Sequence, residues 1–279
     1  MQTPSVNKMW LGTDLYSGSF GKEYAYRDFK PIIDYCADIG MDKIDTAECY
    51  GVDPPVEEML GRALVGKRDK FIIATKFGHQ VKDGHKSENF NLNFIEKQLE
   101  NSLRNLRTDF IDIYYFHSGG NYEFYNDKLW EFLSRKVDSG TIGSLGLSLK
   151  HSLVLNKDYF QINKIKHYGI TIVQTVLNMY SNQSLEHVIP FCKKNGISIL
   201  GRMPFAKGLL TGCYNASHDF KSSDQRSNSP LLNKKIINNF PDITPKDAIN
   251  WCNSCVDGIV VGSKNKKQIQ ENYYLINNS

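Results

Sequence analysis

Short hydrophobic runs alternate along this chain with longer stretches in which hydrophobic side chains recur at helical spacing. Residues 110–116 are almost wholly apolar, which is typical of a parallel strand buried on both faces. Ile95, Leu99 and Leu103 recur on one face of a predicted helix. Eight runs are predicted to be strands, at residues 9–13, 41–44, 70–75, 110–116, 142–148, 170–176, 197–200 and 258–261.

Helical patterns separate these strands. One helix is expected to begin with Asp53 as its N-cap and to end before Gly66. The others are predicted at residues 31–39, 95–106, 124–137, most of 151–167, 185–194, 231–239, 245–253 and 266–276. Repeated β-then-α units without a linker predict an α/β fold, a single-domain (β/α)8 TIM barrel over residues 1–279. The active site of such a barrel lies at the carboxyl ends of its strands.

Three consecutive predicted strands lead into a polar side chain: Asp45, Lys76 and His117, with Tyr50 following in the turn after Asp45. A phenol has an ordinary pKa of about 10, so it transfers protons near neutral pH only beside a cation. Lys76 is the candidate cation, Asp45 the carboxylate that holds it, and His117 a group that orients a carbonyl oxygen. Each residue alone also fits a structural role. Together they favour protonation of a carbonyl while another group delivers hydride.

Composition excludes several classes of protein. The chain has 279 residues, 41% of them hydrophobic, and a net charge of +4 with acids and bases interleaved, which is too small an excess to favour nucleic acid. The excess is compatible with an anionic small ligand. No apolar run reaches the length of a membrane span, and residues 1–8 lack a signal-peptide pattern, so we expect no membrane partner and a cytoplasmic location.

Several short motifs are interpreted as structural. The six cysteines are scattered, which suits reduced thiols, and the C-x-x-C of Cys252 and Cys255 lies in a helical pattern without histidine partners. No metal site is therefore expected. The sequence G-R-A-L-V-G-K at 61–67 has phosphate-loop spacing, but Arg68 stands where a magnesium-binding hydroxyl belongs. The chain has no G-x-G-x-x-G motif, so a Rossmann dinucleotide site is not supported.

Longer motifs resemble the aldo-keto reductase family, in family order from about residue 9 to 272. They are DTAECYG at 45–51, ATK at 74–76, DFIDIYYFH at 109–117, GTIG at 140–143, GLS at 146–148, GLLTG at 208–212 and VGS at 261–263. The resemblance implies a barrel oxidoreductase that acts on CH–OH groups with NADP(H) and a small-molecule carbonyl substrate. It implies that Tyr50 is the general acid, that Lys76 and Asp45 adjust the acidity of Tyr50, and that His117 positions the substrate carbonyl.

The resemblance also implies the cofactor contacts. In the family, the positions of Ser148 and Gln174 bind the nicotinamide carboxamide, the 205–209 loop wraps the diphosphate, and the position of Lys264 meets the adenosine 2′-phosphate. A helix N-terminus beside a lysine suits that phosphate, although the lysine also fits a solvated basic helix start. The expected contacts are Gly12, Thr13, Asp45, Ser148, Gln174, Arg202, Phe205, Lys207, Gly208, Leu209, Ser263, Lys264, Gln268, Glu271 and Asn272.

The chain departs from the family pattern in four places. Leu149 follows Ser148 where the family usually has asparagine, which removes one carboxamide contact. Arg202 stands where an aromatic ring commonly stacks on the nicotinamide, and its planar guanidinium can stack instead. The usual N-terminal hairpin is hardly present before Met9, and the chain ends at Ser279, so the long C-terminal substrate loop is expected to be missing.

These observations lead to a first hypothesis and two alternatives. The first is NADPH-dependent reduction of an aldehyde or ketone to an alcohol, by a protein taken as a monomer by default. The second is an NADPH-binding redox-sensing or regulatory subunit with little turnover, suggested by Leu149 and Arg202. The third is an unrelated barrel lyase or isomerase, in which Lys76 forms a Schiff base.

Overall fold

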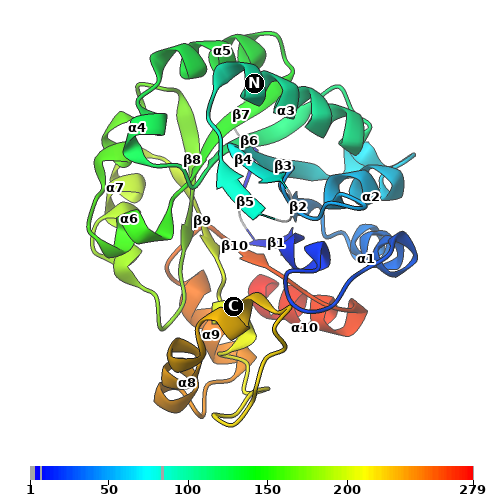
Figure 1. Cartoon of the computed structure of the whole chain (residues 1–279), viewed down its shortest axis with the longest axis vertical. Helices are drawn as coiled ribbons and strands as arrows, with labels where there is room; N and C mark the ends of the chain where they lie inside the picture. Colours follow the sequence, from blue (N-terminus) through cyan, green and yellow to red (C-terminus); the bar gives the residue numbers. More distant parts are fainter. Residues whose placement is uncertain (1–3, 7, 83–84, 279) are drawn as a thin grey trace.

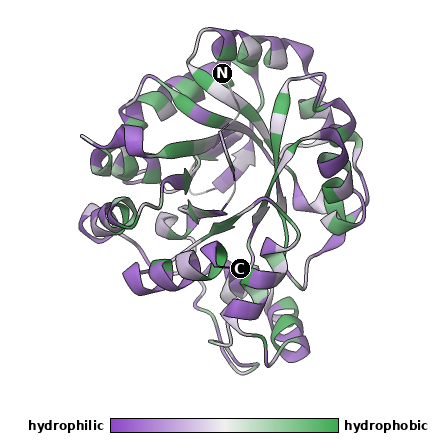
Figure 2. Ribbon diagram, turned by 180° about the vertical axis from the view of Figure 1, so that it is seen from behind, coloured by the Kyte–Doolittle hydropathy of each residue, from purple (hydrophilic) through white to green (hydrophobic). Residues whose placement is uncertain are grey.

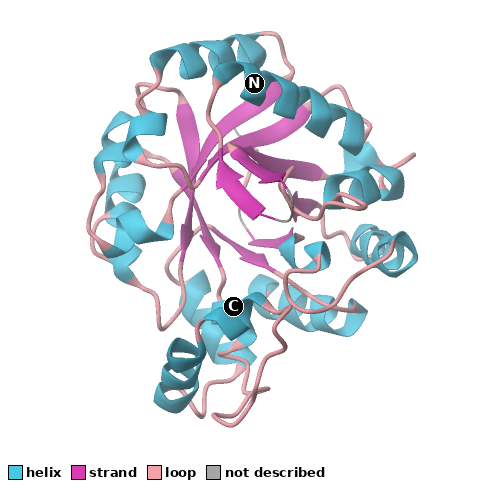
Figure 3. Ribbon diagram, in the orientation of Figure 1, coloured by secondary structure: helices cyan, strands magenta, loops and turns pink. Residues whose placement is uncertain are grey.

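Eight parallel strands close into a barrel, as the sequence predicts. The computed structural model describes residues 4–6, 8–82 and 85–278. The strands pair in the closed order β1-β10-β9-β8-β7-β6-β3-β2, and the helices surround the ring (Figures 1 and 3). The barrel strands are β1 (Lys8–Gly12), β2 (Lys43–Asp45), β3 (Ile72–Phe77), β6 (Ile111–His117), β7 (Ile142–Ser148), β8 (Ile170–Val176), β9 (Ser198–Arg202) and β10 (Gly258–Val261).

The helices form an outer layer whose apolar faces turn toward the strands (Figure 2). They are α1 (Tyr26–Asp38), α2 (Val56–Ala63), α3 (Leu92–Leu106), α4 (Asn121–Phe124), α5 (Asp127–Asp138), α6 (His151–Leu155), α7 (Val188–Asn195), α8 (Pro230–Asn239), α9 (Pro245–Asn253) and α10 (Lys266–Asn277). No helix in the described part of the chain is both long and apolar enough to span a membrane.

Side chains on each strand alternate between two hydrophobic layers. Met9 and Leu11 pack in the large cluster shared with the helices, whereas Trp10 between them belongs to a second, smaller cluster. This second cluster fills the barrel interior. Tyr115 also belongs to it and lies opposite Gly146 on β7, where any Cβ would come within 2.4 Å of the tyrosine ring. Glycine at this position therefore makes room for Tyr115.

Three predicted helices are wrong in part. The helix expected over most of 151–167 is α6 followed by a separate 3-10 helix, Phe160–Lys164, because Lys157 takes a left-handed conformation with φ of 56° between them. The 124–137 helix is α4 and α5, broken after Phe124. The N-cap of α2 is Pro55 rather than Asp53.

The sequence also gives no sign of the hairpin formed by β4 (His79–Lys82) and β5 (His85–Glu88), which stands outside the barrel sheet. Both strands consist mainly of polar residues, so the alternation that marks a half-buried strand is absent. The hairpin follows Phe77 directly and lies over the end of the barrel at which β3 finishes (Figure 1).

Candidate active site

The polar residues predicted from the strand ends share one side of the pleat. Lys76 lies two residues after inward-facing Ala74, and His117 lies two residues after inward-facing Tyr115. Because strand side chains alternate with a period of two, Lys76 and His117 also point inward. The same argument applies to Arg202, two residues after Leu200 on β9. The carboxyl ends of the strands therefore bring these polar groups to one mouth of the barrel.

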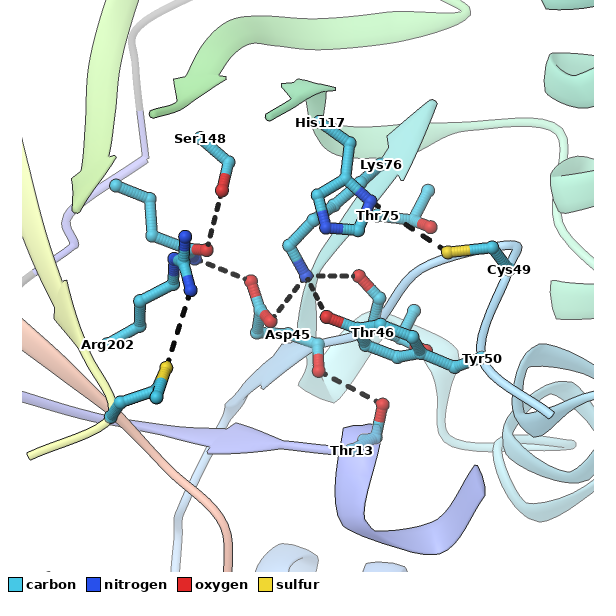
Figure 4. Close-up of polar contacts among 12 residues, drawn as sticks. Thr13, Asp45, Thr46, Cys49, Tyr50, Thr75, Lys76, His117, Ser148 and Arg202 are labelled. Atoms are coloured by element: carbon cyan, nitrogen blue, oxygen red, sulfur yellow. Dashed lines mark hydrogen bonds and ion pairs between the residues drawn. The ribbon is translucent and has the colours of Figure 1, made fainter. Parts of the chain in front are cut away.

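Lys76 connects Asp45 to Tyr50. Its Nζ donates to Asp45 Oδ1 at 2.6 Å, to the Thr46 carbonyl at 2.7 Å and to the Tyr50 hydroxyl at 3.3 Å (Figure 4). The Lys76 and Asp45 side chains are 1% and 5% exposed, so the ion pair is shielded from solvent. The phenolic oxygen is therefore held beside a buried cation whose charge is already balanced.

Asp45 is also held from the opposite side of the barrel. Gln174 on β8 donates from Nε2 to Asp45 Oδ2 at 2.8 Å, and Ser148 at the end of β7 donates from Oγ to Gln174 Oε1 at 3.3 Å. These residues are buried, so the chain of hydrogen bonds fixes the orientation of the carboxylate. Two residues expected to contact a cofactor thus also support Asp45.

The pKa of Tyr50 lies well above its ordinary value of 10.0. Burial is the main cause, and the charges of Asp14 and Asp45 add to it, while Arg202 opposes it. The sequence suggested that Lys76 would favour the phenolate, but burial and the nearby carboxylates outweigh the cation. Tyr50 is consequently a protonated hydroxyl at neutral pH, the form that a general acid requires.

His117 is a neutral imidazole. Burial, followed by the charges of His79, Lys76 and other nearby cations, lowers its pKa well below the ordinary value of 6.5. Its ring centroid lies 6.1 Å from that of Tyr50, with the two rings nearly perpendicular. A neutral imidazole can donate one hydrogen bond to a carbonyl oxygen without competing for the proton of Tyr50.

A cleft of about 420 Å³ runs from these groups toward the start of α10. Of the residues predicted from sequence, Gly12, Asp45, Tyr50, Gln174, Arg202, Phe205, Lys207, Gly208, Lys264, Gln268, Glu271 and Asn272 line it. Thr13, Lys76, His117, Ser148, Leu209 and Ser263 do not. Thr13 instead donates from Oγ1 to the Asp45 carbonyl at 3.1 Å, and Ser263 accepts from Asn272 at 3.2 Å, so both act behind the cleft wall.

Comparison with known proteins decides the family. Residues 8–278 match the model of the Aldo/keto reductase family. The chain belongs to this family. The resemblance in the motifs is therefore confirmed across the whole barrel, and with it the expected class of oxidoreductase.

Two relatives illustrate the range of aldo/keto reductases that this chain resembles. It is 29% identical over 268 residues to the Schizosaccharomyces pombe aldo-keto reductase yakc, whose name includes NADP(+), covering 87% of this chain and 76% of that protein. It is 31% identical over 228 residues to aldo-keto reductase YhdN from Bacillus subtilis, covering 81% of this chain and 63% of that protein.

Solved structures of the family share the fold. The glycerol dehydrogenase AKR11B4 from Gluconobacter oxydans superposes with a TM-score of 0.79 at 22% identity, covering all of this chain and 94% of that one. The holo form of aldo-keto reductase AKR11C1 from Bacillus halodurans gives a TM-score of 0.73, also at 22% identity, over 96% of this chain and 86% of that one. At this identity the likeness supports the barrel architecture alone.

The two departures from the aldo-keto reductase pattern contact each other. Arg202 donates from Nη2 to the Leu149 carbonyl at 3.1 Å and points a second nitrogen at the Met203 sulfur at 3.5 Å. The Leu149 side chain is 3% exposed and packs in the large hydrophobic cluster. The arginine at 202 is therefore hydrogen-bonded to the backbone of the other residue that departs from the family pattern.

Sequence reasoning missed several residues of the cleft wall: Asp14, Leu15, Phe20, Tyr214 and Arg226. Arg226 is 6% exposed, makes an ion pair with Asp224 at 2.6 Å and donates to the Lys207 carbonyl at 3.1 Å. It lies in the short 3-10 helix Gln225–Asn228 after β9, where neither period nor motif marks it. The sequence R-S-N carries no signal of burial, which becomes apparent only from the ion pair in the folded chain.

Proposed function

We propose that this chain is an NADPH-dependent carbonyl reductase that converts an aldehyde or ketone to an alcohol. The observation that carries the proposal is the position of Lys76 Nζ, between Asp45 Oδ1 at 2.6 Å and the Tyr50 hydroxyl at 3.3 Å, directly behind the two residues, Asp45 and Tyr50, that line the cleft. This arrangement supplies a protonated phenol to one face of a bound carbonyl. A lyase working through a Schiff base needs a free amine, whereas Lys76 is bound by a carboxylate in a buried ion pair.

The cleft fits a nicotinamide dinucleotide. Its wall combines apolar side chains of Leu15 and Val260 with the cations of Arg202, Lys207 and Lys264. Anionic phosphates and a flat aromatic ring require such a mixed lining. When bound, the dinucleotide supplies the hydride. In this proposal Gln174 and Ser148 contact its carboxamide, and the loop from Phe205 to Leu209 covers its diphosphate.

The chain's own residues handle the proton. Tyr50 donates its hydroxyl proton to the carbonyl oxygen as negative charge develops there, and becomes a phenolate. Lys76 stabilises that phenolate at close range, because an opposite charge beside a buried group favours its ionised form. Asp45 keeps Lys76 in place throughout. Neutral His117 donates a hydrogen bond to the same carbonyl oxygen and so orients it toward Tyr50.

Lys264 supports NADPH over NADH. Its side chain is exposed at the rim of the cleft, and its backbone N–H donates to Gln268 Oε1 at 2.7 Å, which fixes the turn before α10. A lysine in this position suits a 2′-phosphate as a point charge. The name of the S. pombe relative, which includes NADP(+), agrees with this choice.

A ligand-binding comparison and a turnover assay together test the proposal. We expect NADPH to raise the unfolding temperature more than NADH does, because a ligand at about 100 times its Kd adds about 2.7 kcal/mol of stability. NADPH absorbance should then fall when members of a panel of aldehydes and ketones are added. Tight NADPH binding without turnover of any carbonyl would favour the regulatory alternative, and no binding of either nucleotide would contradict both.

A further inference from the structure

Three metal-ligating side chains from separate elements meet beside Tyr50. They are Cys49 in the loop after β2, His79 at the start of β4 and His117 at the end of β6. One ligand atom from each lies within 4.8 Å of the other two. The Cys49 Sγ is 3.9 Å from His117 Nδ1 (Figure 4). The imidazole centroids of His79 and His117 are 4.4 Å apart. Each residue is 8 or 9% exposed.

His79 contributes an independent observation. Its Nδ1 is buried and has no hydrogen-bond partner among the described residues. The backbone of the same residue is well held, since its carbonyl accepts from Gln98 Nε2 at 2.6 Å. Buried polar atoms are normally satisfied, and an exception at a functional site requires an explanation. His79 thus has a held backbone and an unpartnered ring nitrogen, and one of its two ring nitrogens lies within reach of the other two ligands, so its imidazole is available to a metal ion.

The geometry points to a Zn²⁺ site formed by Cys49, His79 and His117. One thiolate and two imidazoles are ligands that zinc prefers, at about 2.3 Å for sulfur and about 2.0–2.1 Å for nitrogen. Tetrahedral binding at those lengths separates ligand atoms by about 3.4–3.6 Å. Side-chain rotations that move the ligand atoms by about an ångström would therefore bring all three to zinc-binding distance.

The protonation states of the ligands suit this assignment. Burial lowers the pKa of His79 to about 3 and that of His117 well below its usual range, so both imidazoles are in the neutral form that binds metals. Burial raises the pKa of the Cys49 thiol. Zinc binding therefore forms the Zn–S bond as the thiol releases its proton to solvent. The ammonium of Lys86 lies near Cys49, and its positive charge repels a metal ion and weakens zinc binding.

Occupation of this site competes with catalysis, and that consequence rests on the proposed function. His117 belongs both to the zinc site and to the group that orients the carbonyl. Zinc bound to His117 and to the Cys49 thiolate adds a net positive charge next to Lys76 and restricts the imidazole. We expect one equivalent of zinc to lower the rate of carbonyl reduction at least tenfold, and a chelator to restore it.

Direct binding tests the site without reference to activity. Zn²⁺ is titrated into the full chain against a chromophoric chelator, and Co²⁺ is added in a parallel experiment to detect thiolate-to-cobalt charge transfer. Cys49→Ser and His79→Gln remove one ligand each, and His79→Gln keeps the backbone contact to Gln98. The matched controls are Cys213→Ser, at an exposed thiol, and His85→Gln, at an exposed histidine of the same hairpin. Thermal unfolding without metal verifies that each variant is folded.

The expected result is one Zn²⁺ bound by the wild type and by both controls, with affinity reduced at least tenfold in Cys49→Ser and in His79→Gln. Lys86→Met should bind zinc more tightly than the wild type. The thiolate-to-cobalt charge-transfer band should be absent from the spectrum of Cys49→Ser. Wild-type affinity in either ligand variant, or no zinc bound by the wild type, would overturn the site. Because binding is measured without substrate, the test decides this inference even if no carbonyl proves to be reduced.

Discussion

Arg202 Nη2 donates a hydrogen bond to the backbone carbonyl of Leu149 at 3.1 Å, and so joins the ends of β9 and β7 across β8. Both residues depart from the usual family pattern. The bond holds the planar guanidinium in the cleft wall close to Tyr50, where its charge opposes the rise in the tyrosine pKa. An arginine held in this way can take the place of the stacking aromatic ring.

Replacement of Arg202 should therefore weaken cofactor binding. We expect Arg202→Met to raise the Kd for NADPH about tenfold, which corresponds to about 1.4 kcal/mol, through loss of the planar cation. Arg202→Phe, which restores an aromatic ring, should bind NADPH within about threefold of the wild type. Quenching of protein fluorescence on titration with NADPH measures both. Unchanged affinity in Arg202→Met would show that this residue is not part of the cofactor site.

Lys264 should determine the preference between the two nucleotides. Lys264→Ala is expected to raise the Kd for NADPH about tenfold and to leave that for NADH unchanged, because only NADPH carries the 2′-phosphate. Lys266→Ala is the matched control, since that ammonium lies 5.5 Å from the centroid of the Tyr35 ring and so is already engaged outside the cleft. A parallel loss of affinity for both nucleotides would contradict a specific contact with the 2′-phosphate.

Gly61 should matter for packing rather than for phosphate binding. It lies within α2, and a Cβ there would come within 2.1 Å of the Asn105 carbonyl oxygen at the end of α3. Overpacking typically costs about 1–3 kcal/mol, and here the obstacle is backbone, so Gly61→Ala should lower the free energy of unfolding by about 3 kcal/mol. The neighbouring, exposed Arg62→Ala should cost under about 1 kcal/mol. Urea unfolding compares them.

Glu57 should make stability depend on pH. Burial raises its pKa from 4.5 to about 7, although Thr75 donates to its carboxylate at 2.6 Å. Between those two pH values the folded state binds a proton that the unfolded state has lost, so the free energy of unfolding should fall as pH rises, by about 3 kcal/mol in all. Glu57→Gln should remove this loss. Urea unfolding of the wild type and of Glu57→Gln at pH 5 and pH 8 measures this change. If the free energy of unfolding changed equally with pH in the two proteins, Glu57 would not be its cause.

The parts of the fold that the sequence predicts are those with a strong local pattern. The strands predicted at 142–148 and 170–176 are short β-rich runs between helical patterns, and the structure places strands with the same bounds there. The strand ends then locate Asp45, Lys76 and His117 without knowledge of any loop. The β4–β5 hairpin was missed because its strands are polar, and its position over the barrel depends on contacts such as that of Gln98 with the His79 backbone.

Other features of the site arise from contacts between segments far apart in the sequence. Arg202 and Leu149 are each visible as a departure from a motif, but only the closed barrel shows that they are hydrogen-bonded. Cys49, His79 and His117 have no metal-site spacing in the sequence, so their proximity follows from the folded loops alone. The raised pKa of Tyr50 could not be predicted from the sequence for a similar reason, because burial, its largest cause, is a property of the folded chain.

Replacement of Tyr50 by phenylalanine tests whether Tyr50 is the general acid. The substitution removes only the hydroxyl that Lys76 holds at 3.3 Å. We expect NADPH binding, measured by fluorescence, to stay within about twofold of the wild type, while the rate of carbonyl reduction in a single turnover falls by at least about 10²-fold. A variant that binds NADPH and reduces the carbonyl at the wild-type rate would contradict this role of Tyr50.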